Sequence, residues 1–159
     1  MGRARLTAGS ERAPRVAPEG EAELLKKAIE TEKAPRPVGP YSQGLAAGGF
    51  IFVSGQVGFD PSTGGLAGDD VGSQTERALK NVSAVLEAAG AGLDRVVKVN
   101  VFLLDMDDFA TMNEVYGRFF GAAPPPARTS VAVARLPLGA LVEVEAVAIL
   151  GDNSRRGRA

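Results

Sequence analysis

Residues 95–104 read RVVKVNVFLL, and their pattern indicates the class of fold. Apolar side chains recur in it with a period of two residues, the pattern of a strand with one buried face. The alternation predicts a strand with Val97, Val99, Val101 and Leu103 on the inner face, and with Lys98 and Asn100 on the outer face. Such a strand requires sheet partners and a covering layer from the rest of the chain.

The segment before this strand predicts an amphipathic helix. Asp70 is a suitable N-cap, and Gly90 is placed to end the helix. Between them an apolar stripe follows a period of 3.6 residues and predicts the buried face. The stripe contains Val71, Ala78, Leu79, Val82, Val85, Leu86 and Ala89.

The segment after the strand predicts a second helix, opened by Asp105 or Asp107 and stopped by the prolines at 124–126. Its inner stripe contains Phe109, Met112, Tyr116 and either Phe119 or Phe120. We interpret these side chains as core packing rather than as contacts to a cofactor.

Further strands are predicted on both sides of this unit. The stretch FIFVS at 50–54 is rich in aromatic and β-branched residues, whereas 28–31 and 43–47 are weaker candidates, and a loop runs from Asp60 to Asp70. The last two strands, 129–134 and 141–150, are separated by the turn LPLG at 136–139. Two helices can cover only one face of so many strands, so the fold class is α+β, with two layers and a mixed sheet.

The last strand carries a carboxylate face. Val142, Val144, Ala146 and Ala148 alternate with Glu143 and Glu145. Carboxylates do not line a dry core, so their side of the sheet is expected to face solvent, a pocket or a subunit interface. An uncovered sheet face favours self-association.

Composition excludes several classes of enzyme. The 159 residues include no Cys and no His, which removes Ser-His-Asp and Cys-His nucleophiles, His-based ribonuclease chemistry and the commonest metal ligands. Residues 28–150 hold 9 Lys and Arg against 14 Asp and Glu, a net charge of −5, which argues against a nucleic-acid groove. We expect no metal, no nucleic acid and, without an apolar run of 18 residues, no membrane contact.

The chain is sized for one domain with polar ends. Residues 1–24 lack apolar periodicity and are expected to form a disordered extension, residues 25–151 a folded domain, and residues 152–159 a polar tail. The expected location is cytoplasmic, with a mitochondrion or plastid as the alternative if the Arg-containing N-terminus is a transit peptide.

Arg128 is the strongest candidate for binding an anion, because a guanidinium presents a planar fork of donors that matches a carboxylate. Glu143 and Glu145 point the same way, so one of them could accept a proton from water. Spacing alone leaves two other interpretations open. Arg128 could form an ion pair with Glu143 or Glu145, and the two glutamates could lie on a strand face that is simply exposed to solvent.

Five blocks resemble, in order, the signatures of the RidA family of reactive-intermediate deaminases. They are GPYSQG at 39–44, FVSGQVG at 52–58, FATMNEVY at 109–116, PPARTSVAVARLP at 125–137 and VEVEAVAIL at 142–150. The resemblance implies a chorismate-mutase-like domain that forms homotrimers with sites between subunits. It also implies hydrolysis of 2-imino acids, such as 2-iminobutanoate and 2-iminopropanoate, to 2-oxo acids and ammonia without a cofactor.

The resemblance assigns roles to individual residues. It implies that Arg128 binds the substrate carboxylate and that Glu143 positions the attacking water. The residues it implies as the lining of the cleft are Tyr41, Ser54, Gly55, Asn113 and Ser130. Many relatives carry Cys where Ser130 stands.

Three other functions compete with this one. A non-catalytic, small-carboxylate-binding or chaperone-like trimer is the main alternative, which retention of both Arg128 and Glu143 disfavours. A chorismate mutase would need several cationic groups around its dicarboxylate, and an endoribonuclease is disfavoured by the acidic domain and the absence of His.

Overall fold

The computed structural model describes residues 26–121 and 124–151, so the predicted extension 1–24 and tail 152–159 lie outside the described residues. The main element is a six-stranded sheet in the order β1-β2-β3-β8-β6-β7. In chain order these strands are β1 (Lys27–Ile29), β2 (Gly44–Ala47), β3 (Phe50–Val57), β6 (Val96–Leu103), β7 (Ala127–Ala132) and β8 (Val142–Ile149). β6 and β7 run parallel and the other neighbouring strands run antiparallel, which confirms the mixed sheet.

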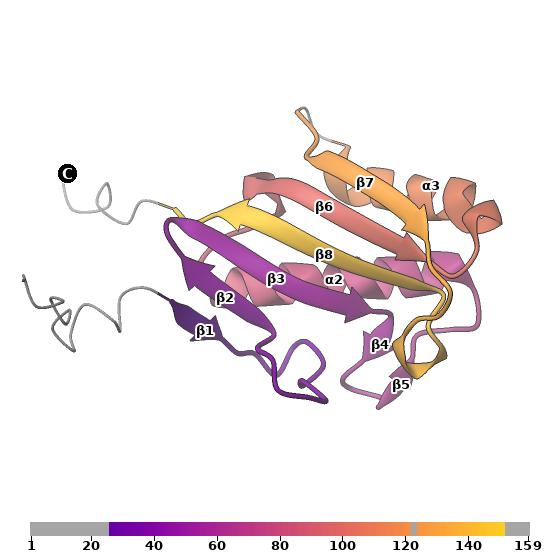
Figure 1. The fold of residues 1–159 in the computed structure, drawn as a ribbon, viewed down its shortest axis with the longest axis horizontal. Helices are drawn as coiled ribbons and strands as arrows, with labels where there is room; N and C mark the ends of the chain where they lie inside the picture. The colour runs from indigo at the N-terminus through magenta and orange to yellow at the C-terminus, as the bar shows by residue number, and fades with distance from the viewer. Residues whose placement is uncertain (1–25, 122–123, 152–159) are drawn as a thin grey trace, which may run out of the picture.

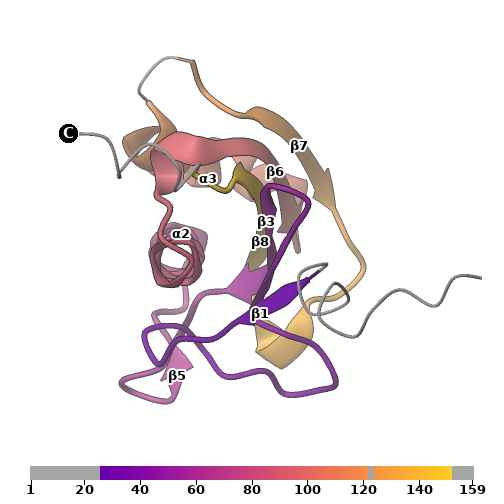
Figure 2. The same cartoon turned by 90° about the vertical axis from the view of Figure 1, so that its left-hand side faces the viewer.

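Two helices, α2 (Val71–Ala88) and α3 (Phe109–Phe120), lie on one face of this sheet (Figures 1 and 2). The connections include three short 3₁₀ turns, η1 (Leu93–Arg95), η2 (Met106–Asp108) and η3 (Pro137–Gly139). The stretch predicted as a loop from Asp60 also contains a small hairpin of β4 (Phe59–Asp60) and β5 (Gly65–Leu66). The two-layer α+β architecture is therefore confirmed.

The ends of α2 form as predicted. Asp70 Oδ1 accepts a hydrogen bond of 2.8 Å from the Ser73 amide, which satisfies a free donor of the first turn. Gly90 adopts a left-handed φ of 78° just after the helix, and its amide donates to the Glu87 carbonyl at 2.9 Å. The predicted stripe is buried from Val71 to Leu86, whereas Ala89 lies past the last turn and is only partly buried.

The start of α3 differs from the expectation. Asp105 Oδ1 accepts a hydrogen bond of 2.9 Å from the Asp107 amide, but this cap begins η2 rather than α3. The N-cap of α3 is Asp108, whose side chain makes no capping bond. Of the two alternatives for the end of the inner stripe, Phe120 is buried and Phe119 is partly buried.

Two predictions about strands are wrong in detail. Val97 is 39% exposed rather than inward-facing, because the pairing of β6 with β8 shifts between Val96 and Lys98 and this bulge breaks the alternation. β7 begins at Ala127 and ends at Ala132, earlier than the predicted 129–134. The strand begins and ends where its residues pair with β6, from Ala127 opposite Lys98 to Ala132 opposite Leu103.

β8 lies in the middle of the sheet and separates the core from an open face. Its alanine and valine residues at even positions are buried beneath the helices, whereas Glu143 and Glu145 point to the other side, as predicted. On that side Phe50 and Phe52 of β3 are 43% and 46% exposed. One face of the sheet therefore lacks a covering layer in the described residues of a single chain.

Candidate active site

Arg128 points into the helix layer, away from the open face. In the parallel pairing, Arg128 lies opposite Val99 and Ser130 lies opposite Val101, and both valines are fully buried beneath the helices. Side chains opposite one another in a sheet share a face, so Arg128 and Ser130 also project toward the helices, at the edge next to α3.

Side chains of α3 hold the guanidinium in place. Arg128 Nη2 donates a hydrogen bond of 2.7 Å to Asn113 Oδ1. The Arg128 Cζ atom also lies 4.4 Å from the ring centroid of Tyr116 and 5.6 Å from that of Phe109, within the range of cation–π contacts. We call Phe109, Asn113, Tyr116, Arg128 and Ser130 the arginine cluster.

Sequence reasoning missed the role of the two aromatic residues, which it interpreted as core. Tyr116 is buried and does pack on Phe120, with 4.7 Å between ring centroids, yet its ring also supports Arg128. The available signal was the spacing of Phe109, Asn113 and Tyr116, which places all three on one side of a helix.

The arginine cluster contains two buried hydroxyl groups, Ser130 Oγ and Tyr116 Oη, with no hydrogen-bond partner in the described structure. Burial raises the pKa of Tyr116, against the opposing effect of the Arg128 charge, so the phenol remains a neutral potential donor. Buried polar groups without partners are rare in native proteins and mark candidate ligand contacts. The cluster therefore has the chemistry of an anion site.

The ion pair considered for Arg128 is absent. In the described residues the salt bridges involve other arginines and lysines. Glu143 pairs with Phe102, and Glu145 pairs with Asn100, at even positions of β6 that face away from the helices. The sheet itself separates both glutamates from Arg128.

Glu143 lines a cavity of about 660 Å³ on the open side, which we call the carboxylate cavity. Tyr41, Ser54 and Gly55, three of the predicted cleft residues, line the same cavity. Its wall is completed by Pro35, Arg36, Val38, Gln56, Val57, Phe59, Pro137, Leu138 and Glu145.

A bulge in β3 shapes the floor of this cavity. The pairing of β3 with β8 shifts between Val53 and Gln56, so Ser54 and Gly55 both lie in the irregular part. A Cβ atom on Gly55 would lie 2.7 Å from Glu143 Cδ. The Glu143 carboxyl group thus occupies the space that a side chain at position 55 would fill.

The electrostatic surroundings make Glu143 a stronger base than an ordinary carboxylate. Burial raises the pKa of Glu143, and the neighbouring charge of Glu145 raises it further. Glu145 is itself held by a 2.6 Å hydrogen bond from Asn100 Nδ2 to its Oε1. A carboxylate with a raised pKa is suited to accept a proton from water near neutral pH.

Gln43 fixes the loop that forms the outer wall of the cavity. This side chain is only 2% exposed, and its amide nitrogen donates to the carbonyl groups of Thr31, Ala34 and Pro35 at 2.8 to 3.1 Å. Its oxygen accepts a 2.7 Å hydrogen bond from the Thr31 amide. One buried amide therefore organises the backbone that leads to Tyr41.

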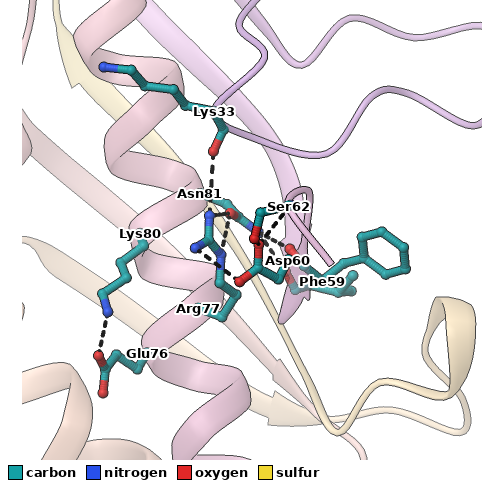
Figure 3. A network of polar contacts seen from close by, with 9 residues as sticks. Lys33, Phe59, Asp60, Ser62, Glu76, Arg77, Lys80 and Asn81 are labelled. Atoms are coloured by element: carbon teal, nitrogen blue, oxygen red, sulfur yellow. Dashed lines mark hydrogen bonds and ion pairs between the residues drawn. The ribbon is translucent and has the colours of Figure 1, made fainter. Parts of the chain in front are cut away.

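A second buried amide, Asn81, supports the inner wall, and Figure 3 shows the network of polar contacts around it. Asn81 of α2 donates to the carbonyl groups of Val57 and Phe59 at 3.1 and 2.9 Å. Its oxygen accepts from Arg77, which also lies 3.6 Å from the Asp60 carboxylate. The network ties the helix layer to the strand ends that line the cavity.

The structure thus divides the seven predicted site residues into two groups. Arg128, Asn113 and Ser130 meet in the arginine cluster, and Tyr41, Ser54, Gly55 and Glu143 meet at the carboxylate cavity. Within one chain the groups lie on opposite faces of the sheet. The arginine cluster has a guanidinium that could bind a small carboxylate, and the carboxylate cavity has a carboxyl group that could accept a proton.

The described residues contain neither a metal-binding cluster nor a membrane-spanning helix. Across 26–121 and 124–151, no group of three or more His, Cys, Asp or Glu side chains is arranged to hold a metal ion. No helix in this part of the chain is both long enough and apolar enough to cross a membrane.

Fold and site together define an α+β protein with an arginine held by helix α3 on one face of the sheet and a carboxyl group of raised pKa on the other face. Comparison with known proteins identifies the family to which the chain belongs. The family model described as Endoribonuclease L-PSP matches residues 31–150, and the chain belongs to this family, the RidA family that its sequence blocks resemble.

Its relatives share the whole domain. A RutC family protein of Pyrococcus abyssi is 53% identical over 79% of this chain and 98% of its own length. The human 2-iminobutanoate/2-iminopropanoate deaminase is 45% identical over 80% of this chain and 93% of its own. The crystal structure of E. coli TdcF with bound serine is 44% identical with a TM-score of 0.75, covering 79% of this chain and 99% of that one.

Proposed function

We propose that the protein is a hydrolytic deaminase that converts 2-imino acids, such as 2-iminobutanoate and 2-iminopropanoate, to 2-oxo acids and ammonia. The observation that carries the proposal is a matched pair of groups. Among the described residues, Arg128 is held by Asn113 and Tyr116 and has no carboxylate partner, and Glu143 is a partly buried carboxyl group that lies over Gly55. The name of the human relative supports this reaction.

The reaction needs only groups that this chain supplies. Arg128 binds the substrate carboxylate, and Glu143 takes a proton from a water molecule as the water oxygen attacks C2 of the protonated imine. Glu143 then passes this proton to the nitrogen of the carbinolamine, the C–N bond breaks and ammonia leaves. Glu143 takes up the remaining hydroxyl proton as the C2 carbonyl forms and releases it to ammonia or solvent. Water is consumed, and no metal or cofactor takes part.

The proposed site lies between subunits. Because the sheet separates the two groups within one chain, the arginine cluster of one subunit must meet the carboxylate cavity of another. The open face with Phe50 and Phe52 offers apolar surface for such contact. We therefore propose a homotrimer of 16.4 kDa chains, and light scattering that finds a stable monomer at micromolar concentration would contradict it.

The test of the activity uses imines made in place from amino acids by an amino-acid oxidase. The wild-type protein is expected to produce the 2-oxo acid faster than the spontaneous reaction. The Arg128→Ala variant is expected to stay folded and to show only the spontaneous rate. An unchanged rate in Arg128→Ala would refute the assigned role of Arg128.

A second candidate is a non-catalytic module that binds small carboxylates, which the serine bound in the TdcF structure favours. This candidate predicts saturable binding of serine or 2-oxobutanoate with no acceleration of imine decay. RNA cleavage, suggested by the family's description, receives less support because the chain has no His and residues 28–150 are acidic.

A further inference from the structure

Leu138 has a backbone conformation that leucine rarely adopts. It is the one non-glycine residue with a positive φ in the described part of the chain, at 58°. Gly139 follows with a φ of 71°, and the Ala140 amide closes the turn on the Pro137 carbonyl at 3.0 Å. Glycine or asparagine would fit position 138 with less strain.

The strained residue also has an exposed side chain that lies at the wall of a cavity. Leu138 is 57% exposed and lines the carboxylate cavity that contains Glu143. Strained residues held in place by their surroundings cluster at ligand-binding positions. The turn that carries Leu138 lies on the side of the sheet away from α2 (Figure 2).

Two further exposed apolar side chains line the same cavity. Val38 is 81% exposed and Tyr41 is 49% exposed, and both come from the loop between β1 and β2. Three exposed apolar groups from two separate loops therefore meet at one cavity, and such grouping is typical of ligand contacts. We call Val38, Tyr41 and Leu138 the apolar wall.

The charges around the cavity narrow the kind of ligand. Arg36 lies at the wall but pairs with Glu32 at 3.3 Å, so its charge already has a partner. Glu143 and Glu145 leave the cavity acidic. An acidic substrate side chain would be repelled there, whereas an apolar one would bury surface against the apolar wall.

We propose that Leu138 determines specificity: with Val38 and Tyr41 it selects 2-imino acids with large apolar side chains, such as the leucine-derived imine, over the alanine-derived and glutamate-derived imines. The assignment rests on the proposed deaminase function. It places the substrate carboxylate at the arginine cluster, the reacting carbon beside Glu143 and the substrate side chain against the apolar wall.

The test compares kcat/KM for imines generated from leucine, alanine and glutamate. Leu138→Asn removes the apolar group, and asparagine tolerates the left-handed backbone. We expect the leucine-to-alanine ratio of kcat/KM to fall about 10-fold in this variant, since a few buried methyl and methylene groups discriminate by at least this factor. Leu138→Met, which restores an apolar side chain, should return the ratio close to that of the wild type.

Leu104→Asn is the matched control, because Leu104 is 40% exposed and lies outside the cavity lining. It should leave all three rates unchanged. If Leu138→Asn keeps the wild-type ratio while imines are still hydrolysed, the specificity assignment is overturned and the deaminase function stands.

A binding readout separates the two proposals. Calorimetry with the stable products 4-methyl-2-oxopentanoate and pyruvate should show a preference for the larger acid that Leu138→Asn removes. If the wild type hydrolyses no imine, the deaminase function fails, and a lost preference in Leu138→Asn would still support the apolar wall. Equal affinity for both acids in the wild type would overturn it.

Discussion

Gly55→Ala tests whether Glu143 acts from the position seen in the structure. The new Cβ atom would lie 2.7 Å from Glu143 Cδ and 3.1 Å from Cγ, whereas carbon atoms in contact are separated by about 3.5 to 4.0 Å. The carboxyl group must therefore withdraw by about 1 Å. A shift of this size costs about 100-fold in rate, so kcat/KM for 2-iminobutanoate should fall by about that factor, or ~2.7 kcal/mol.

The loss should appear in activity and not in stability. The three atoms nearest to the added Cβ all belong to the flexible Glu143 side chain, which can move without disturbing the backbone. The melting temperature of Gly55→Ala should therefore stay close to that of the wild type. Imine hydrolysis and thermal melts measured on the same preparation separate the two effects.

Two glycines provide matched controls. In Gly58→Ala the Cβ would lie 2.6 Å from Gln74 Cα, so backbone must move and stability should fall. In Gly117→Ala, no atom of the described residues beyond the neighbouring helix backbone lies within 4 Å of the new Cβ. Replacing this glycine inside helix α3 should stabilise the protein by about 0.5 to 1 kcal/mol without changing kcat/KM. A Gly55→Ala protein that is folded and fully active would refute the role of Glu143 as the base.

Three further predictions concern the same site. Because burial raises the pKa of Glu143, the rate of imine hydrolysis should begin to fall on acidification at a pH above the ordinary titration range of glutamate. The stability that Glu143 contributes is present at low pH and is lost as the pH rises through the raised pKa, so Glu143→Gln should have a higher melting temperature than the wild type at neutral pH. Equal melting temperatures at all pH values would contradict this. Arg128→Lys keeps the charge but not the bidentate fork. The fall in kcat/KM should therefore correspond to a loss of about 2 to 4 kcal/mol in transition-state stabilisation, while the melting temperature stays that of the wild type. Full activity would exclude bidentate binding. Gln43→Ala leaves buried backbone groups without partners and should lower the free energy of unfolding by about 2 to 3 kcal/mol, measured by urea titration; an unchanged value would show that water replaces the amide.

The faces of the central strands were predictable because alternation is a local property. The buried face of β8 and the outward Glu143 follow directly from the order of apolar and acidic residues. Val97 was assigned to the wrong face because a bulge depends on how two strands pair, and the period of one strand carries no trace of it.

The direction of Arg128 was not predictable from its own strand. It depends on the register of β7 against β6, and a slip of one residue would turn Arg128 to the open face beside the glutamates. Arg128 and Glu143 were candidates from their chemistry and strand position, whereas the other site residues were assigned by resemblance. Neither route identified Tyr116 or Leu138 as part of a site. Their contributions arise from tertiary contacts and backbone conformation.

The opposite orientations of Arg128 and Glu143 have a functional consequence. If both groups faced the same side, they could form the ion pair considered at the outset, which would leave neither free for a substrate. The sheet prevents this within one chain, because β7 presents Arg128 to the helix layer and β8 presents Glu143 to the open face. A complete site of the proposed kind would then require two subunits, each of which would contribute a different group.

This division predicts complementation between two inactive variants. Arg128→Ala chains retain Glu143, and Glu143→Gln chains retain Arg128, so a site that draws on one chain of each kind in the right order is complete. With random assembly of equal amounts of the two chains, about one quarter of the intersubunit sites in a closed trimer should be intact. Coexpressed and copurified mixtures should therefore recover about a quarter of wild-type kcat per site, with each variant alone as the control. If the mixture stays as inactive as its components although mixed assemblies are shown by mass spectrometry, Arg128 and Glu143 do not act together across a subunit boundary.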